Sequence, residues 1–109
     1  MGTAELKQLT DQIVQKLRTH YNPEKIILFG SYADASAQQD SDLDLLIVKD
    51  TKDRFIDRWS TVRHILSDPS RKIPLETVVL TPEEVSERLA RGDQFLAEIL
   101  HKGRVLYAS

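Results

Sequence analysis

Two aspartates separated by one leucine have the type and spacing to do chemistry. Asp42 and Asp44 stand at the start of the apolar run 45–48. Side chains alternate between the faces of a β-strand, so both carboxylates are expected on one face, roughly 7 Å apart at Cα, with Leu43 in the core. Carboxylates at this spacing repel each other, and Mg²⁺, which prefers carboxylate oxygens, relieves that repulsion. The pair therefore predicts a metal site.

A glycine and a serine at the end of the preceding apolar run suit a phosphate. The run 25–29 ends at Gly30 and Ser31. Glycine lets another group approach the backbone, and the residues after it can open a helix whose free N–H groups attract a phosphate. The Ser31 hydroxyl can donate to that phosphate, cap the helix, or do both. A phosphate corner beside a carboxylate pair is what metal-assisted phosphoryl or nucleotidyl transfer requires.

The combined pattern resembles the signature of the DNA polymerase beta-like nucleotidyltransferase superfamily. Gly30, Ser31 and Ala33 match its Gly-Ser-x-Ala, and residues 41–45 match its Ser-Asp-x-Asp-Leu. The chain is similar in particular to the minimal nucleotidyltransferases, the MntA-type antitoxins of HEPN toxins. The resemblance extends over nearly the whole chain. It implies an α+β polymerase beta-like fold, with a small mixed sheet and helices packed mainly on one face.

The resemblance also implies a reaction, with two Mg²⁺ ions and an NTP, preferably ATP. Asp42 and Asp44 would hold one ion on a triphosphate lying against Gly30 and Ser31. The family commonly carries a third carboxylate at the start of a later apolar strand, and Glu76 fits that place. Glu76 would share the second ion, which brings up the acceptor hydroxyl, and is the candidate proton acceptor. The implied acceptor belongs to a HEPN-domain toxin, neutralised by AMP transfer.

Two departures from the family pattern bear on activity. Asp34 and Ala35 stand where many members have Arg-Gly, which removes a positive charge and a flexible residue from beside the expected triphosphate. The third acid is Glu76 rather than the commoner aspartate. These differences keep open a catalytically weak or inactive module that neutralises a HEPN toxin by binding it. A stand-alone transferase for a small hydroxyl compound is a third alternative, disfavoured because the sequence contains no substrate domain.

Composition limits the other classes. The 109 residues, 40% hydrophobic, predict one domain over residues 1–109. A net charge of −2 disfavours direct binding of nucleic acid. No apolar run approaches the roughly 20 residues that span a membrane, and the start lacks a signal-peptide pattern. Without cysteine there is neither a disulfide framework nor a thiolate zinc site. A cytoplasmic location is expected, and any oligomer would include the partner.

Periodicity and capping signals place the elements that must position these residues. We expect helix 3–20, strand 25–29, a strand from Asp42 to residue 48, helix 53–66, strand 73–80, two helices near 82–91 and 94–101, and strand 104–107. Thr81, Pro82 and Glu84 form a capping box with proline at the first helical position. Residues 41–44 could form a similar cap, but the β-branched residues at 47–48 favour a strand there.

Two amphipathic assignments follow from the same periodicity. In helix 53–66 the apolar face comprises Phe55, Trp59, Val62 and Leu66. Arg54, Asp57 and Arg58 fall largely elsewhere around the helix, and the two arginines are assigned to solvent in preference to a phosphate-binding role. In the last helix the apolar face comprises Phe95, Leu96, Ile99 and Leu100. His20, His64 and His101 have no ligand spacing and are expected at the surface.

Overall fold

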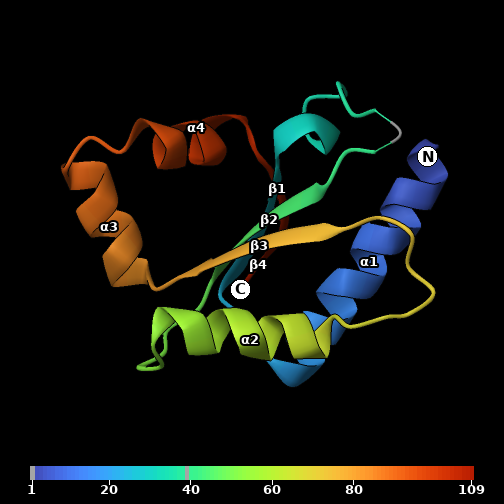
Figure 1. The fold of residues 1–109 in the computed structure, drawn as a ribbon. Helices are drawn as coiled ribbons and strands as arrows, with labels where there is room; N and C mark the ends of the chain where they lie inside the picture. The colour runs from blue at the N-terminus through green and yellow to red at the C-terminus, as the bar shows by residue number, and fades with distance from the viewer. Residues whose placement is uncertain (1, 39) are drawn as a thin grey trace.

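The computed structural model describes residues 2–38 and 40–109, and it has an α+β fold (Figure 1). Gln39, within the predicted polar loop 36–41, lies outside the described residues. The elements in chain order are α1 (Thr3–His20), β1 (Lys25–Phe29), the 3₁₀ turn η1 (Gly30–Tyr32), β2 (Leu43–Val48), α2 (Phe55–Ile65), β3 (Leu75–Leu80), α3 (Pro82–Ala90), α4 (Gln94–Lys102) and β4 (Arg104–Ala108). The mixed secondary structure expected from the sequence is thereby confirmed.

The four strands form one mixed sheet in the order β3-β2-β1-β4. β1 is antiparallel to both β2 and β4, whereas β2 and β3 run parallel. The register places Phe29 of β1 opposite Asp44 and Glu76 of β3 on the other side of Asp44. Asp44 thus lies in the middle of three neighbouring strands.

The two longest helices, α1 and α2, pack on one face of the sheet, where they bury Leu43, Leu45 and Ile47 of β2. α4 packs on the other face, where Leu96 and other apolar residues meet the alternate side chains of β2 and β3. By strand alternation Asp44 and Glu76 belong to this second face. Asp44 is half-buried and Glu76 is exposed, so this face opens toward the start of β2 and β3.

Several strand and helix ends differ from the expected ones. β2 begins at Leu43, so Asp42 lies just before the strand rather than in it. β3 begins at Leu75 because Pro74, which has no N–H, precedes it; the Pro74 carbonyl accepts a hydrogen bond from Leu43 N at 2.9 Å. α2 spans Phe55–Ile65 and is shorter than predicted at both ends.

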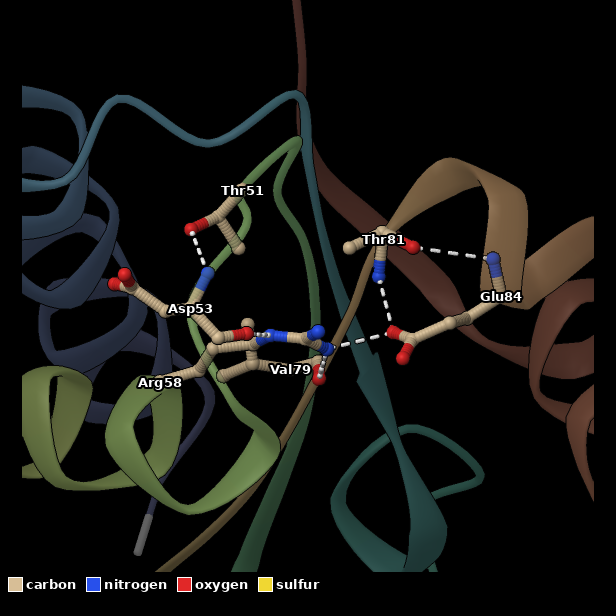
Figure 2. Close-up of polar contacts among 6 residues, drawn as sticks. All are labelled: Thr51, Asp53, Arg58, Val79, Thr81 and Glu84. Carbon is tan, nitrogen blue, oxygen red and sulfur yellow. Dashed lines mark hydrogen bonds and ion pairs between the residues drawn. The ribbon is translucent and has the colours of Figure 1, made fainter.

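Arg58, which we assign to solvent from the sequence, is buried at 7% exposure, so that prediction is wrong. Its Nε donates to the Asp53 carbonyl at 2.8 Å and its Nη1 to Glu84 Oε1 at 2.6 Å (Figure 2). Glu84 also accepts from Thr81 N at 2.8 Å, and Thr81 Oγ1 accepts from Glu84 N at 3.1 Å, which confirms the capping box. One guanidinium therefore joins the starts of α2 and α3.

The apolar face of α2 is also narrower than predicted. Val62 and Leu66 are buried, but Phe55 is 49% exposed and Trp59 is 36% exposed. The sheet supports only the C-terminal half of this helix's apolar stripe. Within residues 2–38 and 40–109, no helix has the length and apolar content needed to cross a membrane.

Candidate functional site

Gly30 lies directly against the carboxylate of Asp44. The pairing of Phe29 with Asp44 brings the end of β1 beside this side chain. A Cβ added at residue 30 would overlap Asp44 Oδ2 and lie 3.2 Å from its Cγ. Gly30 also has φ of +75°, a left-handed conformation that side chains disfavour. The backbone angle favours glycine and the overlap with Asp44 requires it, and the Gly30 backbone is exposed to solvent.

The carboxylates of Asp42 and Glu76 both lie within electrostatic reach of Asp44 at this corner. Burial raises the pKa of Asp44, and the charges of Asp42 and Glu76 raise it further. Glu76 is the β3 partner of Asp44, and Asp42 lies one residue before β2. Parallel pairing of β2 with β3 therefore brings the third predicted acid to the aspartate pair.

The donor set fits a magnesium ion in chemical type. Carboxylate oxygens are preferred ligands of Mg²⁺, and a cation would relieve the repulsion that raises the Asp44 pKa. In the part of the chain that the structure describes, no three His, Cys, Asp or Glu side chains converge into a finished metal site. Asp42 and Glu76 are each near enough to Asp44 to raise its pKa, but the three side chains do not form a finished ligand shell in this structure.

The serine corner is a single turn rather than the start of a longer helix. η1 spans three residues, and the Gly30 carbonyl accepts hydrogen bonds from the backbone N–H groups of Ala33 at 3.0 Å and Asp34 at 3.2 Å. The macrodipole of so short a helix is small because few peptide dipoles add together. Binding of a phosphate at Gly30 and Ser31 would therefore depend on nearby hydrogen-bond donors rather than on a helix dipole. Ser31, which is half-buried, is one such residue.

The backbone after this turn keeps the shape expected of a glycine, although the residue is alanine. Ala35 has φ of +64°, in the left-handed region. Asp34 Oδ1 accepts a hydrogen bond from Ser36 N at 3.0 Å and another from the Ser36 hydroxyl. These bonds, the side-chain one first, lower the pKa of Asp34, and the positive charge of Lys102 lowers it further. The Asp34 carboxylate thus closes the turn, and α4 brings a cation near it.

A cleft of about 210 Å³ lies between this turn and α4, which sit at the same end of the molecule (Figure 1). Its walls include Phe29, Gly30, Asp34, Phe95, Glu98 and Lys102. Phe95, predicted to lie in the apolar face of its helix, is 60% exposed, whereas Leu96 and Ile99 are buried as expected. The four apolar residues of α4 form one broad stripe along the helix. The sequence alone does not show which side of this stripe the sheet covers and which side it leaves exposed.

Comparison with known proteins identifies the relatives of this chain. The sequence model of the family described as "Polymerase beta, Nucleotidyltransferase" matches residues 11–109. A protein from Methanocaldococcus jannaschii with the provisional name protein adenylyltransferase is 33% identical over 112 residues, which cover 98% of this chain and 75% of that protein.

Two solved structures show a similar fold. One is the crystal structure of a toxin-antitoxin with AMP-PNP, with a TM-score of 0.64 and 20% identity over 92% of this chain and 73% of that one. The other contains a tri-AMPylated Shewanella oneidensis HEPN toxin in complex with an MNT antitoxin, with a TM-score of 0.59 and 19% identity over 94% of this chain and 72% of that one.

Proposed function

The chain belongs to the polymerase beta nucleotidyltransferase family, and from this premise we propose that it transfers AMP from ATP to a hydroxyl of a partner protein. The provisional name of the Methanocaldococcus relative supports a protein acceptor. The fold shared with toxin-antitoxin complexes supports a HEPN-domain toxin as the partner and an antitoxin role for this chain. The nucleotidyltransferase class itself follows from family membership.

The observation that carries the proposal is the position of Asp44. Gly30, the residue proposed to receive the phosphates, packs against its carboxylate. Glu76, the residue proposed to receive the acceptor, pairs with it across the parallel strands. Nucleotide, metal ligands and acceptor would then meet around one side chain, which is the arrangement that in-line transfer requires.

In the proposed mechanism, Gly30 and Ser31 bind and orient the triphosphate through local hydrogen-bond donors. Asp42, Asp44 and Glu76 would hold two Mg²⁺ ions, which when bound polarise the phosphate oxygens and offset developing negative charge. The acceptor hydroxyl oxygen forms a bond to the α-phosphorus, the bond from that phosphorus to the bridging oxygen breaks, and pyrophosphate leaves. Glu76, the most exposed of the three acids, accepts the hydroxyl proton.

A second candidate is an antitoxin that masks its partner without transferring AMP. Asp34 favours this alternative because it places a carboxylate, rather than the family's arginine, beside Gly30 in the same cleft. Negative charge there disfavours a triphosphate. The two candidate functions share a partner. They differ in whether neutralising the toxin requires the acidic cluster, which comprises Asp42, Asp44 and Glu76.

Labelling of the partner tests the proposal. Incubation with labelled ATP, Mg²⁺ and a HEPN-domain protein from the same genome should label that protein. The double substitution Asp42→Asn with Asp44→Asn should abolish labelling while circular dichroism shows an intact fold. The control is Asp50→Asn with Asp53→Asn, which removes two charges from exposed positions away from the cluster. Equal toxin neutralisation by wild type and the site variant, without labelling by either, would favour masking.

A further inference from the structure

Phe95 is a large apolar side chain that the fold leaves uncovered. α4 buries Leu96 and Ile99 against the sheet, yet Phe95 remains 60% exposed. Its ring meets Phe29 edge to face, with centroids 5.9 Å apart and an interplanar angle of 83°. Because most of the Phe95 side chain remains exposed and it lines a cleft, part of its ring is available to a ligand in that cleft. Aromatic walls with a few polar groups are typical of small-molecule sites.

The cleft at Phe95 joins the acidic cluster through Gly30. Gly30 lines the cleft and at the same time packs against the Asp44 carboxylate. Phe29, the other aromatic wall, is the direct cross-strand neighbour of Asp44. A ligand with one end at Asp44 could therefore extend its other end into this cleft.

The charges around the cleft indicate whether it is better suited to the base or to the triphosphate of a nucleotide. Asp34 and Glu98 carry carboxylates and Lys102 carries an ammonium group, so the rim has a net negative charge. Lys102 Nζ donates a hydrogen bond to Glu98 Oε1 at 3.2 Å, so the positive charge of Lys102 is partly offset by Glu98. A triphosphate would be repelled here, whereas a neutral heteroaromatic ring would stack on Phe95 and could donate hydrogen bonds from an amino group to the carboxylates.

We propose that this cleft binds the base of the nucleoside triphosphate, a purine carrying an exocyclic amino group, with its ring stacked on Phe95. The inference rests on the proposed function and deepens it, because it assigns base recognition to α4. Phe95 is then a specificity-determining residue. Gly30 marks the boundary between the base and the phosphates.

The test compares binding of ATP with binding of inorganic tripolyphosphate, which has no base, in the presence of Mg²⁺. Phe95→Ala should weaken ATP binding roughly 5- to 150-fold, the equivalent of losing one base–aromatic stack, and leave tripolyphosphate binding unchanged. Phe55→Ala is the matched control, since Phe55 is a similarly exposed phenylalanine on α2. It should change neither affinity.

A conservative variant and a second nucleotide separate ring stacking from recognition of the amino group. Phe95→Tyr keeps an aromatic face and should bind ATP as wild type does, provided that melting curves show both Phe95 variants folded. ITP, which has a carbonyl in place of the amino group, should bind more weakly than ATP.

Several results would overturn the base assignment. Unchanged ATP affinity in Phe95→Ala is one, and an equal loss of ATP and tripolyphosphate affinity is another. Unchanged ATP affinity combined with weaker transfer to the partner would make the cleft a protein contact instead. If wild type bound neither ATP nor tripolyphosphate, the proposed function itself would fail, and the two failures are thereby distinguishable.

Discussion

At the corner between β1 and η1, backbone conformation and packing act on the same residue. Gly30 has a left-handed φ, and the Asp44 carboxylate occupies the space that a Cβ would need. Ala35, five residues later, shows that the chain tolerates an alanine in the left-handed conformation. The close approach to Asp44, more than the backbone angle, therefore makes residue 30 special.

Comparing Gly30→Ala with a control glycine should separate the cost of the left-handed backbone from the cost of overlap with Asp44. Left-handed strain costs about 1–2 kcal/mol, and overlap with Asp44 should add to it and displace the carboxylate. Gly92→Ala is the matched control, because Gly92 has φ of +82° and nothing within 4 Å of an added Cβ. Chemical denaturation should show a larger loss of stability for Gly30→Ala, and only this variant should lose transfer activity. Equal losses in both variants would contradict the role given to Asp44.

At the level of elements, α2 shows that neighbouring elements decide which side chains of a helix are buried and which are exposed. Its predicted solvent-facing Arg58 is buried, whereas its predicted core residues Phe55 and Trp59 are exposed. Arg58 is retained inside because Asp53, Val79 and Glu84 supply hydrogen-bond acceptors from three separate elements or loops (Figure 2). The guanidinium thereby fixes the end of β3 and the start of α3.

Arg58→Ala should destabilise the protein by about 2–3 kcal/mol, since it leaves buried acceptors without their donor. Arg54→Ala on the same helix is the control. Arg54 pairs with Asp57 at 3.0 Å, but its side chain is 81% exposed and the pair is screened by solvent, so its removal should destabilise the protein much less than Arg58→Ala does. Urea denaturation of both variants measures the difference. Comparable effects would mean that Arg58 contributes no more than a surface pair.

The same contact predicts a dependence on pH. The hydrogen bond from Arg58 is the largest cause that lowers the pKa of Glu84. A depressed carboxyl pKa stabilises the fold above the ordinary glutamate range of about 4.3, and this contribution is lost as pH falls through the lowered value. The stability gap between wild type and Arg58→Ala should therefore narrow as the pH falls below about 4. The side chain of Glu84 is 36% exposed, so solvent screening reduces this effect.

For the whole molecule, the two faces of the sheet have different tasks. α1 and α2 close one face with a continuous apolar core, whereas α4 covers only part of the other. The acidic cluster and the cleft at Phe95 both lie toward the open end of that second face. Ligand binding there should stabilise the entire fold, because the unfolded chain has no such site.

Divalent metal should reveal this coupling in melting curves of wild type and Asp44→Asn. Without metal, the raised pKa of Asp44 means that the carboxyl favours the fold at pH below about 4, and that this contribution is lost as pH rises through the folded-state value. Near neutral pH, Asp44→Asn should therefore melt no lower than wild type. Mg²⁺ should stabilise wild type, by about 2.7 kcal/mol at a hundredfold excess over Kd, and not the variant.

Asp50→Asn is the control for this experiment, since Asp50 is exposed in the loop after β2. It should respond to Mg²⁺ as wild type does. A lower melting temperature for metal-free Asp44→Asn would argue against repulsion within the cluster. An equal Mg²⁺ shift in wild type and Asp44→Asn would show that the ion binds elsewhere.

The sequence by itself determined what depends on near neighbours. Helix periodicity gave α1 its observed bounds, and the Thr81–Glu84 cap and the strand ending at Gly30 appear where local chemistry places them. These features need only contacts within a few residues along the chain. The Gly-Ser and Asp-x-Asp spacing, with the resemblance it carries, also gave the family.

Beyond what the family resemblance implied for Glu76, only the tertiary structure decided which distant residues meet. Parallel pairing of β2 with β3 put Glu76 beside Asp44, and antiparallel pairing with β1 put Gly30 there too. The burial of Arg58 and the exposure of Phe95 likewise depend on where the sheet ends beneath each helix. The physical reason is that burial is set by the packing of separate elements, which no local pattern along the chain records.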